Sequence, residues 1–179
     1  MNFQVLLGGI GQALSNPKFR LLWWTNTVNS TGRWQYKFAV SWYTWETTKS
    51  PVLLGIVAFA DTVPLVFMTV IAGAWTDCYS TMLIMRICQS IMVAAGILIS
   101  VFALTGSLNI IYIIVLSFVI GAAEAVTVPA RLSVVHQLVP RDQLSSAIAL
   151  GSASFNLARF IGPAMAGIFI QVFDVPMTI

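Results

Sequence analysis

Several charged side chains stand inside long apolar stretches of this sequence, among them Arg33, Asp61 and Arg159. A cation at the centre of a bilayer costs about 2.5–3.5 kcal/mol on insertion scales, so charges at that depth are rarely turned toward lipid. Such side chains pair with one another or line a wet cavity. Their positions are therefore the first place to look for a binding or transport function.

The stretch that carries Arg33 also carries other polar residues at steps of three or four, which places them on one face of a helix. They are Asn26, Asn29, Ser30, Arg33 and Lys37. Two interpretations remain open: a cavity-lining helix whose cations meet an anionic or polar substrate, or a buried ion pair that only fixes helix packing. Asp61 lies at a similar depth in the next stretch, and we predict an Arg33–Asp61 pair.

Two acids are candidates for carrying protons, namely Asp61 and Glu124. Glu124 lies in an apolar stretch, and its alternative role is to pair with Arg131 or another loop cation. Near the C-terminus, Asn156 and Arg159 form a polar face that we expect to line a substrate cavity. We expect no cofactor and no metal, because no ligand spacing is present, and no enzymatic activity, because no Ser/His, paired-Asp or His-rich arrangement occurs.

The elements that position these residues follow from composition. Of the 179 residues, 58% are hydrophobic and 8% charged, against about 25% charged in a typical soluble domain; mean hydropathy is +0.88. A membrane-spanning helix needs roughly 20 apolar residues. We predict an all-α, polytopic membrane helix bundle of five transmembrane helices (residues 21–170), at about 21–45, 51–75, 82–104, 108–128 and 146–170.

The remaining segments connect or flank these spans. Residues 1–20 are predicted to be a cytoplasmic or interfacial segment, and 129–145 a cytoplasmic loop with a short amphipathic helix after Pro129. Basic residues gather on one side of the predicted bundle (Lys18, Arg20, Arg131 and Arg141). By the positive-inside rule, the N-terminus is then cytoplasmic and 171–179 is extracytoplasmic.

Small residues at four-residue steps predict close helix contacts. One set is Ser117, Gly121 and Ala125. A longer set, on the last span, forms a groove for another helix: Ala147, Gly151, Ser154, Ala158, Gly162 and Ala166. We expect a bend at Gly162–Pro163.

Several blocks of the sequence carry a family resemblance. They are NPKFRLLW at 16–23, the run Gly32-x-Trp34-x4-Ala39, TTKSPVLLG at 47–55, AGAWTD at 72–77, and the long block at 128–167. The chain resembles the N-terminal half of a major facilitator superfamily transporter, of the bacterial branch with enterobactin exporters and macrolide efflux proteins. That fold has twelve helices in two halves that rock about a central cavity.

The resemblance implies roles for further residues. Gly73 and Asp77, followed by Arg86, match the cytoplasmic loop motif of the superfamily, although Cys78, Ser80 and Thr81 stand where basic residues are usual. Another similarity is to the glycine-proline motif of antiporter-type members. It covers Gly162, Pro163 and Gly167, and it implies proton-coupled efflux of an amphiphilic compound of the drug or siderophore class.

We expect the chain to reside in a bacterial inner (plasma) membrane, in contact with lipid and a small-molecule substrate, and not with nucleic acid. Compared with the family, it stops before a sixth helix. The expectation is therefore a fragment that works with a missing C-terminal half or another copy of itself. The alternative is a non-transport membrane subunit, or an inactive truncated product, that binds partner helices.

Overall fold

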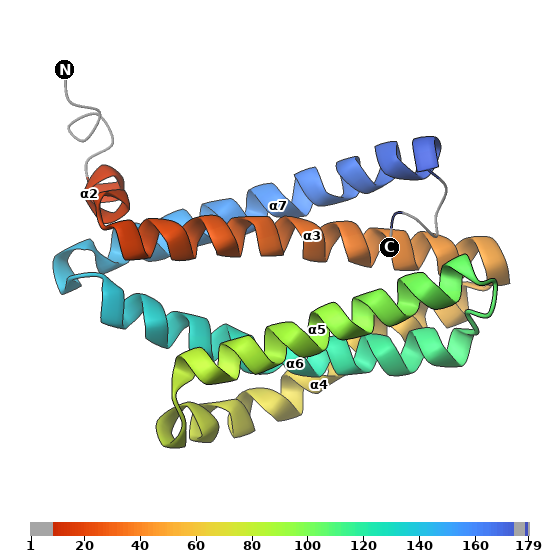
Figure 1. The fold of residues 1–179 in the computed structure, drawn as a ribbon, viewed down its shortest axis with the longest axis horizontal. Coiled ribbons are helices and arrows are strands. Elements are labelled where there is room, and N and C mark those ends of the chain that lie inside the picture. Colours follow the sequence, from red (N-terminus) through yellow and green to blue (C-terminus); the bar gives the residue numbers. More distant parts are fainter. Residues whose placement is uncertain (1–8, 174–177, 179) are drawn as a thin grey trace.

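A computed structural model describes residues 9–173 and 178 (Figure 1). This part is helical and contains no strand, which confirms an all-α membrane helix bundle. Its elements are α2 (Gly9–Ser15), α3 (Pro17–Thr48), α4 (Pro51–Cys78), α5 (Thr81–Leu104), α6 (Ile110–Leu138), the 3₁₀ turn η1 (Arg141–Gln143) and α7 (Leu144–Phe173). Residues 1–8 of the predicted N-terminal segment lie outside the described part. So do residues 174–177 and 179 of the predicted extracytoplasmic end.

The long helices begin where the sequence supplies a cap. The side chain of Asn16 accepts hydrogen bonds from the backbone N–H groups of Lys18 and Phe19, and Pro17 occupies the first turn of α3. At the start of α4, the side chain of Ser50 accepts a hydrogen bond from the backbone N–H of Leu53, and Pro51 occupies the first turn. A capping oxygen satisfies backbone donors that the first turn leaves without partners. The first two predicted spans are therefore separated by a link of only two residues.

Four helices are long and apolar enough to cross a membrane: α4, α5, α6 and α7. The first predicted span is not among them. Helix α3 has 32 residues, and at about 1.5 Å per residue it exceeds the thickness of a bilayer. Its polar stripe lowers its hydropathy, which is why length and composition alone do not identify it as a span.

The helices divide into two groups, which meet where α3 contacts α4 and α6 and where α7 contacts α6. Helices α4 and α5 both pack against α6, and α7 packs along α3. Figure 1 shows these two groups one above the other, with the start of α3, the end of α6 and the start of α7 at the same end of the bundle. A cavity between α3, α6 and α7 lies at this end.

Two glycines set the closest helix contacts. A Cβ added at Gly121 of α6 would lie 2.1 Å from the backbone oxygen of Asp61 on α4. One added at Gly162 of α7 would lie 2.6 Å from Cβ of Trp34 on α3. Both positions lie in the predicted small-residue sets, and each admits a backbone approach that any side chain would block. The close contacts predicted from these two sets are confirmed.

The predicted break at Pro129 is wrong. Helix α6 continues through Pro129 to Leu138, so no separate amphipathic helix follows. A proline removes one backbone donor, whereas Ala130 and Val134 continue the buried face and pack with Ile84 and Met85 of α5. This packing keeps the segment helical, and Figure 1 shows the second half of α6 angled toward the start of α3.

The groove of small residues on α7 is already occupied within the chain. Ala147, Ser154, Ala158, Gly162 and Ala166 are buried, and α3 packs along this helix. Gly151 is exposed, and neither Gly151 nor Gly167 has a neighbour within 4 Å of an added Cβ. The helix also continues through Pro163. A partner helix from another protein therefore finds this groove filled.

Candidate functional site

Two cations hold one carboxylate between α3 and α4. Nη2 of Arg33 lies 2.6 Å from Oδ1 of Asp61, and Nζ of Lys37 lies 2.7 Å from Oδ2. The side chains of Arg33 and Asp61 are 13% and 11% exposed, and that of Lys37 is 36% exposed. The predicted Arg33–Asp61 pair is therefore confirmed, and Lys37 extends it to a triad.

The triad carries an excess of one positive charge. Asp61 neutralises only one of its two partners, and Nε and Nη1 of Arg33 are buried without a hydrogen-bond partner. Each oxygen of Asp61 has a cation beside it, at 2.6 Å and 2.7 Å. Asp61 therefore holds the two cations in place between α3 and α4.

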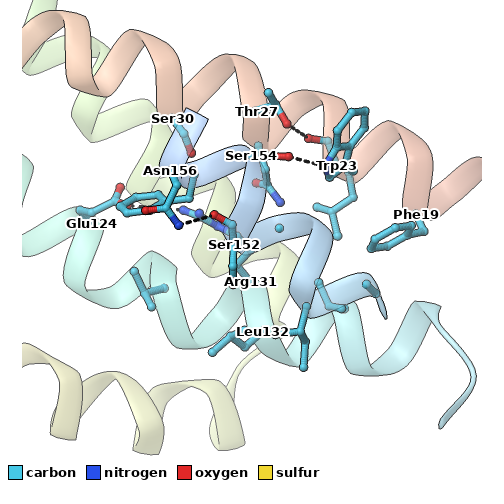
Figure 2. A pocket seen from close by; sticks show the side chains of 18 residues that line it. Phe19, Trp23, Thr27, Ser30, Glu124, Arg131, Leu132, Ser152, Ser154 and Asn156 are labelled. Carbon is cyan, nitrogen blue, oxygen red and sulfur yellow. Dashed lines mark hydrogen bonds and ion pairs between the residues drawn. The ribbon is translucent and has the colours of Figure 1, made fainter. Parts of the chain in front are cut away.

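A cavity of about 520 Å³ lies between α3, α6 and α7. Aromatic and aliphatic side chains form most of its wall, including Phe19, Trp23 and Phe155. Figure 2 shows the polar groups that interrupt this wall. They come from all three helices: Asn26, Thr27 and Ser30 from α3, Glu124 and Arg131 from α6, and Ser152, Ser154 and Asn156 from α7.

Glu124 and Arg131 form a loose pair in the wall of the cavity. Nη2 of Arg131 lies 3.5 Å from Oε1 of Glu124, which is at the outer limit for a hydrogen bond. Oε2 of Glu124 and Nε of Arg131 are buried without a hydrogen-bond partner. A ligand that enters the cavity could supply the missing contacts. The predicted pairing of Glu124 with Arg131 is confirmed. Glu124 lies midway along α6 and not near its end, because this helix extends beyond Pro129 to Leu138.

Two polar contacts fasten the helices around the cavity. Nε1 of Trp23 donates to Oγ of Ser154 at 2.8 Å, which ties α3 to α7, and Figure 2 draws this bond across the wall. Nδ2 of Asn16 donates to the backbone oxygen of Leu138 at 2.8 Å, which ties the start of α3 to the end of α6. Sequence reasoning missed both, since neither residue pair has a recognisable spacing.

Trp34 joins the cavity to the charged residues. Its ring lies edge-on to Phe155, with centroids 6.0 Å apart. Nζ of Lys37 and Cζ of Arg159 each lie 5.4 Å from the centroid of the Trp34 ring, within reach of a cation–π contact. Sequence reasoning used Trp34 only as part of a family motif. Trp34 precedes Lys37 by three residues, and residues at this spacing are neighbours on a helix. This spacing could have placed Trp34 beside the charged residues.

The other predicted site residues are distributed as follows. Asn26 and Asn156 line the cavity, whereas Asn29 lines a separate, more open hollow between α3 and α5. Arg159 is exposed on α7, and it meets α3 through Trp34.

The residues of the cytoplasmic loop motif are away from the cavity. Gly73 is partly buried near the end of α4, and Arg86 is exposed on α5. The side chain of Asp77 lies outside the described part of the structure. In that part, no group of three His, Cys, Asp or Glu side chains is placed to hold a metal ion.

Comparison with known proteins identifies the family. The sequence profile described as "transmembrane secretion effector", a major facilitator family, matches residues 11–178. The chain belongs to this family of major facilitator transporters. It is therefore a membrane protein of a family of transporters, and not of enzymes.

Three curated relatives illustrate the similarity. The staphyloferrin A transporter of Staphylococcus aureus is 31% identical over 149 residues, which cover 82% of this chain and 37% of that protein. The uncharacterized transporter y4rN of Sinorhizobium fredii is 31% identical over 66% of this chain and 29% of its own length. Macrolide efflux protein A of Streptococcus pyogenes is 22% identical over 88% of this chain and 39% of its own length.

These matches also set the scale of the chain. The matched region spans less than two fifths of each of these relatives. No solved structure matches the sequence. The arrangement of the cavity is therefore described from this chain alone.

Proposed function

We propose that this chain forms part of a transporter that exports amphiphilic small molecules from a bacterial cell in exchange for protons. The observation that carries the proposal is the cavity between α3, α6 and α7, whose mostly apolar wall holds one loosely paired acid, Glu124. Two relatives carry names of transport proteins for a siderophore and for macrolides. An apolar wall with a few convergent polar groups suits compounds of that amphiphilic kind.

The direction follows from the position of the cavity. It opens where α3 begins and α6 ends, and Lys18, Arg20 and Arg141 lie at the helix ends that meet there. Basic residues mark the cytoplasmic side of inner-membrane proteins. On this basis α3 also spans the membrane, in addition to α4, α5, α6 and α7, and the N-terminus is cytoplasmic. The cavity then loads from the cytoplasmic side of the bacterial inner membrane.

Glu124 is our candidate for proton coupling. Its Oε2 is buried and has no hydrogen-bond partner, so it can accept either a proton or a hydrogen bond from a ligand, but not both at one lone pair. Binding of the substrate and protonation of Glu124 then exclude each other. An exchange of substrate for protons requires this. Asp61 does not offer this choice, because Arg33 and Lys37 occupy both of its oxygens.

Alternating access needs helices on both sides of the cavity. We propose that the rest of a longer protein, or a second copy of this chain, supplies them. A non-transport subunit that binds a foreign helix is not favoured, because α3 fills the groove on α7.

The test uses 1-pyrenebutanol, an uncharged amphiphile with a hydroxyl donor. Its affinity for the purified 179-residue chain in nanodiscs is measured by tryptophan-to-pyrene energy transfer from pH 5 to pH 8, with empty nanodiscs as the blank. We expect the affinity to rise with pH until Glu124 is fully ionised. In Glu124→Gln the affinity becomes independent of pH, whereas Glu46→Gln, at an exposed position on α3, keeps the wild-type slope. No saturable binding, or an unchanged slope in Glu124→Gln, would refute the proposal.

A further inference from the structure

A cluster of three cations and one acid continues the inner wall of the cavity. On α3, Trp34 and Lys37 follow the cavity residue Ser30 at steps of four and three. On α7, Arg159 follows Phe155 at a step of four. Such steps keep side chains on one helical face. Lys37 and Arg159 therefore lie one to two turns beyond the cavity, along the same faces that line it.

The two cations converge on one ring. Both charged groups lie 5.4 Å from the centroid of Trp34, so they are separated by no more than twice that distance. Trp34 in turn touches Phe155, which lines the cavity. The apolar wall and the cationic cluster thus form one continuous surface. Its shape suits a molecule with an apolar body and a charged end.

The cluster contains fewer acids than cations. Asp61 is the acid that pairs with Arg33 and Lys37, and Arg159 forms no ion pair with an acid in the described part of the chain. Arg33, Lys37, Arg159 and Asp61 together carry a charge of +2. Arg159 also lies halfway along α7 and is exposed. An arginine at that depth without a counter-ion is costly, so a negative charge from outside these residues would complete the cluster.

We infer that Lys37 and Arg159, which both approach the Trp34 ring, bind the anionic group of an amphiphilic substrate whose apolar body occupies the cavity. The chemical class is an organic anion, such as a carboxylate attached to a ring system. Ammonium and guanidinium groups donate charge-assisted hydrogen bonds to carboxylates, and Trp34 and Phe155 cover the adjoining apolar part. This inference rests on the proposed function, because it specifies the substrate of the same cavity.

A second feature agrees with this assignment. Nζ of Lys37 bonds Asp61 and faces Trp34 while its side chain is still 36% exposed. An ammonium has three donors, so Lys37 can stay bonded to Asp61 and donate a further hydrogen bond to a second anion. Arg159 can also bind this anion, and it gives up no ion pair of the described part of the chain in doing so. Asp61 on α4 would then hold Lys37 in place for the ligand.

Three pyrene amphiphiles with the same ring system test the inference: 1-pyrenebutyrate, 1-pyrenebutanol and 1-pyrenebutylammonium. Binding to the 179-residue chain in nanodiscs is measured at pH 8 against empty nanodiscs. We expect the anion to bind roughly tenfold more tightly than the alcohol, the factor that one good charge-assisted contact supplies, and the cation to bind most weakly. The double variant Lys37→Gln/Arg159→Gln should bind anion and alcohol equally.

The control is Arg86→Gln, which removes an exposed arginine from α5 and should keep the wild-type preference for the anion. Saturable binding of all three probes without a charge preference would overturn the inference and leave the proposed function standing. Tighter binding of the cation would assign the Trp34 ring to cationic substrates and overturn it as well. Absence of saturable binding by any probe would refute the proposed function and the inference together. The wild-type comparison needs no variant, so misfolding of the double variant would not conceal the answer.

Discussion

Arg33 and Asp61 lie on successive helices and meet at 2.6 Å, with both side chains nearly buried. Removing one partner of a buried pair costs about 3–5 kcal/mol, because the other charge stays behind without compensation. Here Lys37 makes the two removals unequal. Without Arg33, Asp61 keeps Lys37 at 2.7 Å, whereas without Asp61 two cations remain.

The first prediction is therefore an asymmetry between neutral variants. We expect Asp61→Asn to lower the free energy of unfolding more than Arg33→Gln, the former by about 3–5 kcal/mol and the latter by less. Unfolding in sodium dodecyl sulfate, followed by circular dichroism, measures both. The charge-reversed double variant Arg33→Asp/Asp61→Arg should recover part of the loss. Equal losses, or no recovery, would mean that the pair does not act as the structure places it.

The second prediction concerns the close helix contacts. In Gly162→Ala and Gly121→Ala, the new methyl group meets backbone or Cβ atoms at 2.6 and 2.1 Å, and the helices must separate. Overpacking of this kind costs about 1–3 kcal/mol. Gly151→Ala is the matched control on α7: nothing lies within 4 Å of its Cβ, and helix propensity favours alanine by about 1 kcal/mol. Thermal unfolding in detergent should rank the control at or above the wild type, and a destabilised control would contradict the contact assignment.

The third prediction separates two roles of Asn16. Its side-chain oxygen caps α3, and its Nδ2 donates to Leu138. Asn16→Asp keeps the capping oxygen and loses the donor, so it should loosen the end of α6 while α3 stays capped. Asn16→Ala loses both and should cost about 1 kcal/mol more. Hydrogen exchange at residues 135–139 and 18–20 distinguishes the two variants. Identical exchange patterns would show that the tie to Leu138 contributes nothing.

Some of these relations could be derived from the sequence because they depend on depth and spacing alone. Arg33 and Asp61 lie in adjacent apolar stretches joined by a short link, which places them at similar heights. The small residues around Gly121 and Gly162 share one face by simple periodicity. Pairings of this kind need no knowledge of how the bundle folds back on itself.

Other features depend on tertiary packing and were out of reach. Pro129 marks a break only if its neighbours have nothing to pack against, and Ala130 and Val134 pack well. The polar stripe on α3 is wide enough to border two hollows. Asn26 lines the cavity between α3, α6 and α7, and Asn29 lines the hollow between α3 and α5. The approach of Arg159 to Trp34 requires α7 to lie along α3, a choice of neighbour that sequence periodicity does not specify.

The fourth prediction concerns Trp23 and Ser154, which close the wall between α3 and α7. In Ser154→Ala the indole N–H loses its acceptor, and a lost buried hydrogen bond costs about 1–3 kcal/mol. We expect lower thermal stability and weaker binding of 1-pyrenebutanol, since the wall of the cavity loosens. Ser152→Ala, at an exposed position two residues earlier, is the control and should leave stability unchanged. Equal effects of Ser154→Ala and Ser152→Ala would mean that the Trp23–Ser154 hydrogen bond does not stabilise the wall of the cavity.

Central to the proposed function is a single water-filled cavity enclosed by the polar faces of α3, α6 and α7. Single cysteines introduced into a Cys78→Ser/Cys88→Ala background report it through their reaction with a membrane-impermeant thiol reagent in proteoliposomes. We predict that Asn26→Cys and Ser152→Cys, both in the cavity wall, react rapidly and are protected by 1-pyrenebutanol. Leu157→Cys and Phe160→Cys, exposed on α7 but outside the wall, should react slowly and without protection. If all four reacted alike, the cavity would not exist as a wet interior in the membrane.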